Sequence, residues 1–286
     1  MPCTPFSSPP PPRKPKMSPP PAQSPSTLRR LLLPLLVSSA FLHLAGAHRS
    51  SFSFSSALSE WRPARASYYA ASDPRDTVGG ACGYGDLGKS GYGLATVGLS
   101  TALFEKGLAC GGCYEVRCVE ELQYCIPGTS IALTATNFCP PNYGLPSDAG
   151  GLCNPPNSHF VMPIAAFEKI AIWKAGVLPI QYRRIKCGRE GGVRFTIEGR
   201  RFFVAVLISN VAGAGDVTAV KVKGTATGWL QMGRNWGQNW HIAADLRGQP
   251  LSFELTTSDG VTLTSYNVAP HDWSFRQTYI GKQFLF

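Results

Sequence analysis

The alternation of apolar and polar residues divides the chain into two β-rich regions. In the first, from 66 to 187, three short runs alternate as strands do: Cys113–Val119, Ser130–Thr136 and Gln181–Ile185. Two stretches there have helical spacing and helix end signals: Ser100–Leu108 and Pro163–Lys174. The first region is therefore predicted to be mainly β, with minor helices.

The second region, from 193 to 286, has longer apolar runs separated by turn residues. Five of these runs are predicted to be strands: Val193–Ile197, Arg201–Ser209, Asp216–Lys223, Leu251–Thr257 and Val261–Tyr266. Short strands at this spacing are typical of an antiparallel β-sandwich. A polar segment, 188–192, forms the predicted hinge between the two domains. The fold class is all-β, in two domains.

The start of the chain has a pattern of its own. Arg29 and Arg30 precede an apolar run over 31–44, and the small residues 45–47 follow. This is the order of a signal peptide, so 1–47 is predicted to be a signal with a Pro-rich lead, cleaved on secretion. A retained disordered tail is the alternative, and translation from Met17 would shorten the lead. The Ser-rich segment 48–65 is predicted to be a flexible arm.

The net charge and the length of the apolar run near the start indicate which kinds of partner the protein can have. The chain has 27 basic and 17 acidic residues, a formal charge of +10, and 1–47 holds five of the bases and no acid, so the body carries 22 − 17 = +5. This mild excess favours acidic polymers only weakly, and we expect no nucleic-acid partner. The apolar run near the start is short for a bilayer span, so no stable membrane insertion is expected.

Cysteine use fits the secretory route. Eight of the nine cysteines lie within 82–187. An even number behind a signal peptide predicts four disulfides. Cys110-Gly-Gly-Cys113 is also compatible with a redox or zinc pair, but zinc sites usually include a second close pair. Neither a metal nor a cofactor is therefore expected.

The candidate catalytic groups do not form a recognisable set. Sugar-chain hydrolysis needs two carboxylates facing one bond. The first domain offers nine acids without an evident partner: Asp73, Asp76, Asp86, Glu105, Glu115, Glu120, Glu121, Asp148 and Glu168. The Gly-x-Ser-x-Gly elbow of serine hydrolases is absent, and the Gly-rich segment 79–85 lacks the Lys of a phosphate loop. No catalytic residue is predicted from the pattern.

Aromatic side chains provide a stronger signal. A flat ring can lie against the CH face of a sugar, and burying about 60 Å² per ring face gives roughly 1.5 kcal/mol. Trp229 and Trp273 are predicted to be core residues. Trp236 is flanked by Asn235, Gly237 and Gln238 and is expected in an exposed turn. Strand alternation sends one ring of Phe202-Phe203 outward, and Phe202 is taken with Trp236 as the predicted binding platform.

Five ordered motifs between 66 and 286 together resemble the plant α-expansins. They are Gly79-Gly80-Ala81-Cys82-Gly83-Tyr84-Gly85, Thr134-Ala135-Thr136-Asn137-Phe138-Cys139-Pro140-Pro141, Tyr182-Arg183-Arg184, Asn210-Val211-Ala212-Gly213-Ala214-Gly215-Asp216 and Arg234-Asn235-Trp236-Gly237-Gln238-Asn239-Trp240. The resemblance implies a six-stranded double-psi β-barrel over 66–187, like family-45 endoglucanases. It also implies an immunoglobulin-like, cellulose-binding sandwich over 193–286.

The resemblance also implies residue roles. The family's disulfides correspond here to Cys82–Cys110, Cys113–Cys187, Cys118–Cys125 and Cys139–Cys153. Its polysaccharide groove corresponds to Ser67, Tyr69, Thr136, Asn137 and His159, with Ser67 in place of the family's Thr.

One departure from the family pattern affects the predicted chemistry. The α-expansin pattern His-Phe-Asp reads His159-Phe160-Val161 here, and valine can donate neither a proton nor a hydrogen bond. The usual second carboxylate is already missing throughout the family. The resemblance therefore implies a protein that loosens walls without hydrolysis. Two alternatives are a polysaccharide binder whose loosening activity was lost with the Asp, and a family-45-like endoglucanase using Asp148 or Asp86.

The expected partners and location follow from the same resemblance. We expect cellulose and matrix glucans such as xyloglucan as partners, a monomeric protein, and secretion to the extracellular cell wall.

Overall fold

A computed structural model describes residues 60–71 and 80–285, and the structural statements below concern these residues. The predicted signal over 1–47, most of the predicted arm, and the candidate acids Asp73 and Asp76 lie outside the described residues.

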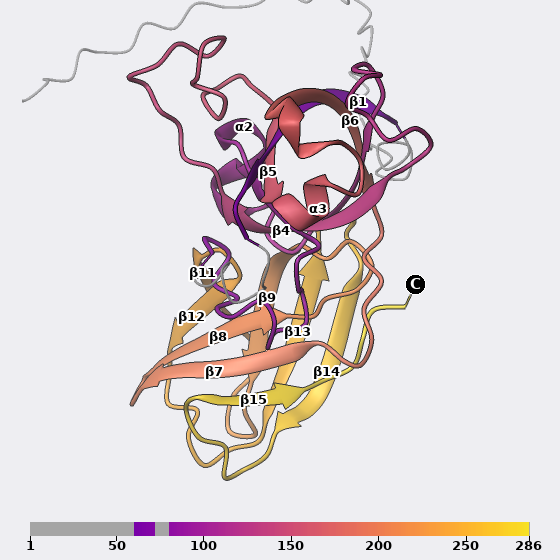
Figure 1. Cartoon of the computed structure of the whole chain (residues 1–286). Coiled ribbons are helices and arrows are strands. Elements are labelled where there is room, and N and C mark those ends of the chain that lie inside the picture. Colours follow the sequence, from indigo (N-terminus) through magenta and orange to yellow (C-terminus); the bar gives the residue numbers. More distant parts are fainter. Residues whose placement is uncertain (1–59, 72–79, 286) are drawn as a thin grey trace, which may run out of the picture. The chain divides into compact units, whose positions relative to one another are not determined.

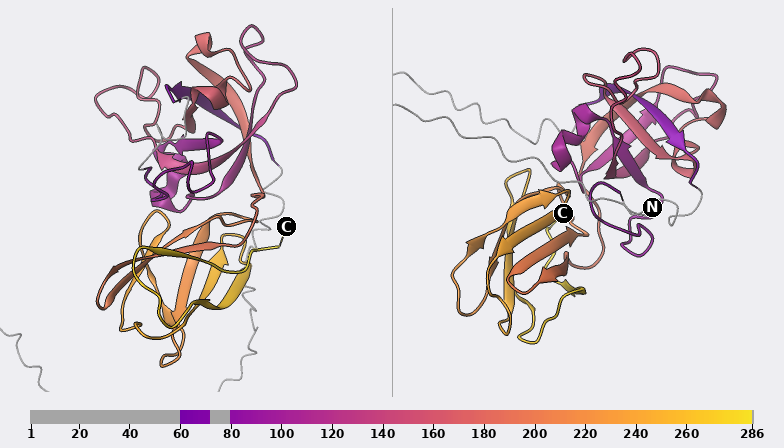
Figure 2. Two further views of the ribbon diagram at one scale, coloured as in Figure 1. Left: turned by 60° about the horizontal axis from the view of Figure 1, so that its bottom comes forward. Right: turned by 90° about the vertical axis from the view of Figure 1, so that its left-hand side faces the viewer.

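The first domain is a closed six-stranded barrel (Figures 1 and 2). Its strands are β1 (Arg62–Tyr69), β2 (Thr96–Leu99), β3 (Cys113–Cys118), β4 (Ile131–Phe138), β5 (His159–Pro163) and β6 (Val177–Ile185). Their order around the barrel is β1-β5-β2-β4-β3-β6. The pairs β1–β5 and β2–β4 are parallel, whereas the other neighbours are antiparallel. The six-stranded barrel implied by the resemblance is confirmed.

Strand β1 corrects the prediction of a flexible arm over 48–65. It begins at Arg62, pairs with β6 along one edge and with β5 along the other, and so closes the barrel. Its sequence, rich in Arg, Ser and Ala, lacks the apolar run that marks a buried strand. Pairing on both edges therefore determines this strand more than its side chains do.

In both segments that were predicted to be helical, the observed helix covers fewer residues than the prediction. Ser100–Leu108 contains α2 (Thr101–Phe104) and the 3-10 turn η2 (Glu105–Gly107). Pro163–Lys174 is helical only in α3 (Ile164–Phe167), before the turn η3 (Trp173–Ala175). The helix ends early because the next residues pair with another segment through a bridge between Ala171 and Cys125. None of the helices among the described residues is long and apolar enough to cross a bilayer.

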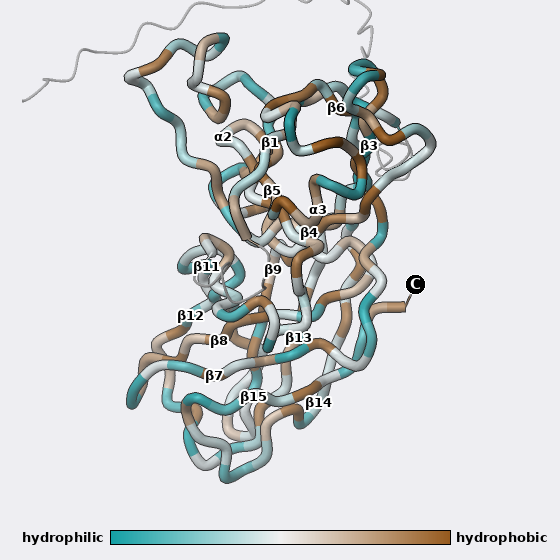
Figure 3. The backbone as a smooth tube through the Cα atoms, in the orientation of Figure 1, coloured by the Kyte–Doolittle hydropathy of each residue, from teal (hydrophilic) through white to brown (hydrophobic). Residues whose placement is uncertain are grey.

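The second domain is a sandwich of two antiparallel sheets. Its strands are β7 (Arg194–Arg200), β8 (Phe203–Ser209), β9 (Val217–Lys223), β10 (Leu230–Gln231), β11 (Gly233–Trp236), β12 (Asn239–Ala243), β13 (Leu251–Thr257), β14 (Thr262–Ala269) and β15 (Gln277–Ile280). One sheet has the order β10-β9-β13-β14 and the other β11-β12-β8-β7-β15. Apolar and polar residues both recur along the strands (Figure 3), and the apolar side chains meet in one core.

The sequence predicted the sandwich and five of its strands, and missed the shorter ones. The five predicted runs correspond to β7, β8, β9, β13 and β14. The stretch around β10, β11 and β12 is rich in Gly, Asn and Gln, so its apolar pattern is weak. Strand β15 lies at a sheet edge and pairs only with β7 in that sheet.

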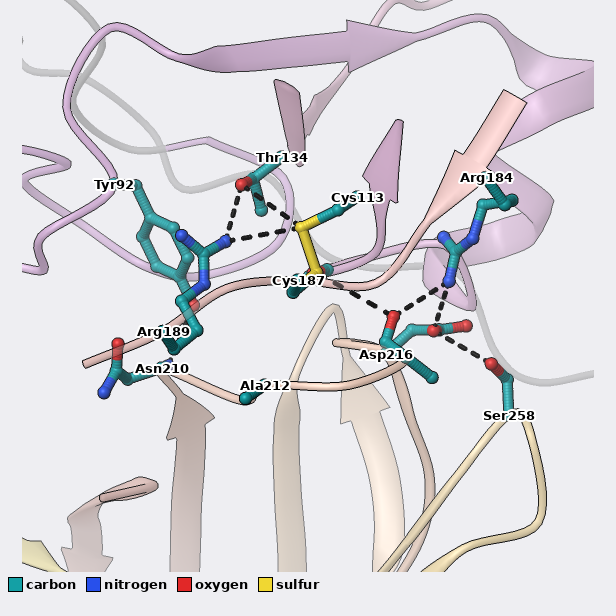
Figure 4. The surroundings of a disulfide bond; sticks show 12 residues. Tyr92, Cys113, Thr134, Arg184, Cys187, Arg189, Asn210, Ala212, Asp216 and Ser258 are labelled. Carbon is teal, nitrogen blue, oxygen red and sulfur yellow. Dashed lines mark hydrogen bonds and ion pairs between the residues drawn. A yellow bond between two sulfur atoms is a disulfide. The ribbon is translucent and has the colours of Figure 1, made fainter. Parts of the chain in front are cut away.

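All four disulfides are confirmed: Cys82–Cys110, Cys113–Cys187, Cys118–Cys125 and Cys139–Cys153. Polar contacts surround the second of them (Figure 4). Arg189 donates a hydrogen bond to the Thr134 hydroxyl, and Arg184 forms an ion pair with Asp216, which also accepts a hydrogen bond from Ser258 at 2.9 Å. These contacts connect barrel residues to the loop before β9 and to the β13–β14 turn.

Candidate functional site

Four residues form a row across neighbouring strands of the barrel. Ser67 in β1 pairs with Val161 in β5, Val161 pairs with Gly98 in β2, and Gly98 pairs with Asn137 in β4. Asn137 is exposed, and Ser67 and Val161 are half-buried. Because Gly98 has no side chain, the row is low at its centre. A polymer chain lying along it would meet a hydroxyl, an isopropyl group, bare backbone and an amide.

His159 lies under one end of this row. It is 1% exposed, and its Nε2 is 2.8 Å from the Ser67 hydroxyl oxygen. The Ser100 hydroxyl accepts a hydrogen bond from the His159 backbone N–H and donates one to the Asn157 carbonyl. Ser100, predicted only as a helix start, therefore also holds β5 in place. His159 thus orients Ser67 rather than meeting a ligand directly.

The remaining predicted groove residues differ in accessibility. Tyr69 pairs with Pro163 at the far end of β1 and is half-buried, and burial raises the pKa of its phenol. The Thr136 side chain is buried at 2% exposure, and its carbonyl accepts the Cys82 N–H. The Asn137 side-chain oxygen accepts hydrogen bonds from the N–H groups of Ala81 and Phe138, each at 2.8 Å. Its NH₂ group is thereby fixed in orientation.

The groove row has no titrating group in the acidic to neutral range. Ser67, Val161, Gly98 and Asn137 carry no charge. Burial, with a smaller contribution from the Arg65 guanidinium, lowers the pKa of His159 to about 4. Val161 occupies the position at which the family pattern has its acid. The row can therefore offer hydrogen bonds and apolar contact, but it contains no general acid.

Aromatic side chains lie on the outer face of the five-stranded sheet. In β8, Phe203 is exposed while Val204 is buried, so Phe203 points away from the core. The ring of His241 in β12 stacks on Phe203 with 5.7 Å between centroids. A side chain at Gly233 would lie 3.2 Å from the His241 ring, so this glycine leaves space for the imidazole on the sheet. Sequence reasoning missed His241, because only the strand register brings it to Phe203.

Trp236 ends β11 on the same side of the sheet. It pairs with Asn239, which in turn pairs with Leu207, whereas the neighbouring Trp240 is buried in the core. Trp236 is 51% exposed, as its predicted place in an exposed turn requires. From the register, Trp236 and Phe203 are separated by about 13 Å along the strands and about 9.5 Å across them. Trp236, His241 and Phe203, called the ring platform below, form a diagonal across three strands.

Phe202 lies in the turn before β8 rather than in the strand. Its ring is exposed, and the Arg247 guanidinium lies over it, 5.3 Å from the ring centroid. The ring is therefore partly occupied by a cation from the protein itself. The structure does not bring Phe202 into the register of the ring platform.

Two residues attach the β11–β12 turn to the barrel. The Gln238 side chain is buried and donates to the Cys110 carbonyl at 2.8 Å, and its backbone N–H donates to the Cys82 carbonyl at 3.0 Å. Gly237 has φ of +52°, and a Cβ there would lie 2.5 Å from the Cys82 carbonyl oxygen. Only glycine allows this approach. The Cys82–Cys110 disulfide therefore anchors the turn that carries Trp236.

Within residues 60–71 and 80–285, no group of three His, Cys, Asp or Glu side chains is placed to hold a metal ion. Cys110 and Cys113, the pair that sequence alone left open to zinc or redox chemistry, belong to two different disulfides.

Comparisons with known proteins agree with this architecture. Residues 193–270 match the expansin C-terminal domain family, and residues 96–182 match a family described as lytic transglycolase. Expansin-A10 of Oryza sativa subsp. japonica is 74% identical over 231 residues, which cover 81% of this chain and 90% of the relative. Expansin-A13 of Arabidopsis thaliana is 65% identical over 263 residues, covering 90% of this chain and 99% of the relative.

This chain belongs to the plant α-expansins. It is a wall-loosening protein that acts without hydrolysis, located at the extracellular cell wall, and wall polysaccharides are its partners. The fold is shared with the solved expansin of Clavibacter michiganensis, with a TM-score of 0.60 at 15% identity over 79% of this chain and 98% of that one. The family resemblance, the fold class and the nonhydrolytic activity predicted from the sequence are confirmed.

The buried imidazole makes a testable contribution to stability. The folded-state pKa of His159 is about 4, below the ordinary 6.5, so the unfolded chain binds the proton first as the pH falls. Between pH 7 and pH 4 this group should lower the free energy of unfolding by about 3 kcal/mol. Urea unfolding at several pH values measures it. His159→Gln should lose this part of the pH dependence, and the exposed His271→Gln should keep it. Equal slopes for His159→Gln and the wild type would contradict the assignment.

Proposed function

We propose that this expansin grips a single glucan chain in the barrel groove while its ring platform lies on cellulose. The groove comprises Ser67, Tyr69, Asn137 and Val161, with Thr136 and His159 supporting it from below. By offering competing contacts, the protein displaces noncovalent contacts between cellulose microfibrils and matrix glucans such as xyloglucan. No bond is cleaved.

The observation that carries the proposal is the neutral row of Ser67, Val161, Gly98 and Asn137 on four adjacent strands. Hydroxyl and amide groups can exchange hydrogen bonds with sugar hydroxyls, and each exchange is nearly balanced against water. Such contacts hold a chain reversibly. Cleavage of a glycosidic bond would need two carboxylates about 5–9.5 Å apart, and this row contains none.

The ring platform supplies affinity by stacking. Each ring face buried against a sugar contributes roughly 1.5 kcal/mol before ordering costs. Phe203 replaces Phe202 in the proposed platform, because Phe203 shares a sheet face with His241 and Trp236 while Arg247 covers Phe202. A variant of the Clavibacter michiganensis expansin has been solved in complex with cellohexaose, which supports a cello-oligosaccharide as the ligand class.

The proposal also includes secretion of the protein and its oligomeric state. The pattern over 1–47 supports cleavage of a signal peptide and secretion before the protein acts in the wall. One chain carries both the groove and the platform, so a monomer is sufficient for the activity.

Wall extension and sugar release test the mode of action together. Purified protein added to heat-inactivated walls under constant load should extend them, because the groove and the platform compete for glucan contacts. Reducing ends should stay at the level of the buffer control. Sugar release in proportion to extension would contradict the proposal. Cellulose binding without any extension would instead identify the alternative, a binder that has lost loosening activity with Val161.

Neighbouring phenylalanines provide a matched test of the platform. Phe203→Ala should weaken cellulose binding by about tenfold, as expected for losing one stacked ring face. Phe202→Ala removes a ring of similar exposure that lies outside the platform, and its affinity should stay within about twofold of wild type. Depletion isotherms on microcrystalline cellulose measure both. A larger loss for Phe202→Ala than for Phe203→Ala would restore Phe202 as the platform residue.

Val161 allows a test of pH dependence. His159, with a pKa of about 4, stays mostly neutral at pH 4.5, and the groove has no carboxyl group, so the wild-type extension rate, corrected for walls without protein, should vary less than about twofold between pH 6.5 and 4.5. Val161→Asp introduces a carboxyl group between Ser67 and Gly98. Its extension rate should rise as the pH falls and this group takes up a proton. Val161→Asn is the control of similar size that cannot titrate. Identical profiles for wild type and Val161→Asp would show that this position does not set the pH dependence.

A further inference from the structure

An apolar pocket of about 560 Å³ lies between the groove and the ring platform. Its walls include three aromatic side chains: Phe104 at the end of α2, Phe138 at the end of β4 and Trp236 at the end of β11. The Phe104 and Phe138 centroids are 4.9 Å apart with a tilt of 32°. The volume lies in the range of small-molecule sites, about 300–1,000 Å³. Trp236 belongs to both the ring platform and this pocket, whereas Phe104 and Phe138 belong to neither the groove nor the platform.

The pocket walls offer few hydrogen bonds. The Thr101 hydroxyl already donates to the Cys153 carbonyl at 3.1 Å, Ala81 and Ala102 are apolar, and the Asn235 amide lies at an exposed position of the lining. A sugar ring enclosed there would leave hydroxyl groups without partners, which is costly for buried polar groups. The open ring platform does not impose this cost, because it leaves the sugar edges in water. The pocket therefore selects a ring that lacks hydroxyl groups around its edge.

Charges at the pocket rim balance. Glu105 and Lys106 are exposed neighbours of opposite sign, held in place by left-handed backbone with φ of +49° and +56°. An anion or cation gains little net attraction from such a pair. The rim thus favours a neutral ligand, and aromatic rings pack well against other rings at centroid distances of about 4.5–7 Å.

The pocket borders the groove where Ala81 meets Asn137. The Ala81 N–H donates to the Asn137 side chain, and Phe138 follows Asn137 in β4, so two pocket residues flank a groove residue. Gly237 and Gln238 hold Trp236 beside Gly83, which fixes the opposite side. A ligand that enters the pocket from the groove would keep its sugar part at Asn137.

We propose that this pocket binds a planar, neutral aromatic ring attached to a glucan as a substituent. The sugar chain occupies the groove and the attached ring lies among Phe104, Phe138 and Trp236. This assignment rests on the proposed glucan groove and extends it: the protein prefers aryl-substituted glucan to the bare polymer.

Calorimetric titration with two soluble probes tests the preference. Phenyl β-cellobioside should bind the wild type about tenfold more tightly than methyl β-cellobioside, as expected when one more ring face is buried. Ala102 is exposed at the pocket, so Ala102→Trp should fill the pocket without disturbing the core. It should reduce the tenfold preference to about one while leaving methyl β-cellobioside binding within about twofold. Ala226→Trp, at an exposed position in the β9–β10 loop, is the matched control and should keep the preference.

Phe203→Ala separates this pocket from the platform. It should leave the affinity for both cellobiosides, and therefore their ratio, within about twofold of wild type while weakening cellulose binding, because Phe203 lines neither the pocket nor the groove that holds the sugar. Equal affinities in the wild type, or a preference that survives in Ala102→Trp, would overturn the pocket assignment. So would failure of both probes to bind. Cellulose depletion, measured on the same preparations, decides the proposed function separately: retained cellulose binding leaves that function standing when the pocket assignment fails.

Discussion

The attachment of the β11–β12 turn to the Cys82–Cys110 disulfide is the contact on which the candidate surfaces depend. Gln238 donates two hydrogen bonds to carbonyls of the disulfide's own cysteines, and its side-chain oxygen accepts the Trp240 indole N–H at 3.3 Å. Its backbone carbonyl accepts the Ile208 N–H at 3.1 Å. Every polar group of a buried side chain is thus used, which makes the contact specific and costly to break. One residue therefore connects the barrel's covalent frame to the sheet that carries the rings.

This attachment gives the proposed groove, pocket and platform a fixed spacing. Trp236 precedes Gly237 and Gln238 directly, so its ring is positioned by the barrel as well as by its own sheet. Asn137 reaches the same region through its bonds to Ala81 and Phe138. A glucan that contacts both domains meets groups whose spacing is already fixed, so less ordering entropy is lost on binding. All four disulfides lie in the first domain.

The sequence predicted the large features because each of them has a pattern that can be recognised within one segment, without knowledge of the segments that pack against it. The strands β7, β8, β9 and β13 have continuous apolar faces, and the even cysteine count marked four disulfides before their pairing was known. Features that depend on distant partners were harder to predict. Strand β1 is defined by its two neighbours. Helix α3 ends at Phe167, and four residues later Ala171 bridges to Cys125. His241 joins Phe203 only through the β8–β12 register. The choice between Phe202 and Phe203 is of the same kind, because it depends on the residue at which β8 begins.

Weak contacts suit the activity better than strong ones. Three stacked rings at roughly 1.5 kcal/mol each give about 4.5 kcal/mol before the ordering cost, which corresponds to millimolar affinity at best. A protein that bound cellulose much more tightly would remain at one junction, since its dissociation rate would limit movement to the next. A groove without a charged group keeps its contacts equally weak, because neutral hydrogen bonds exchange with water at little net gain while charge-assisted bonds are about twice as strong. Val161 in place of an acid is consistent with the proposed function, in which the groove exchanges partners along the glucan while the rings hold the protein near the cellulose surface.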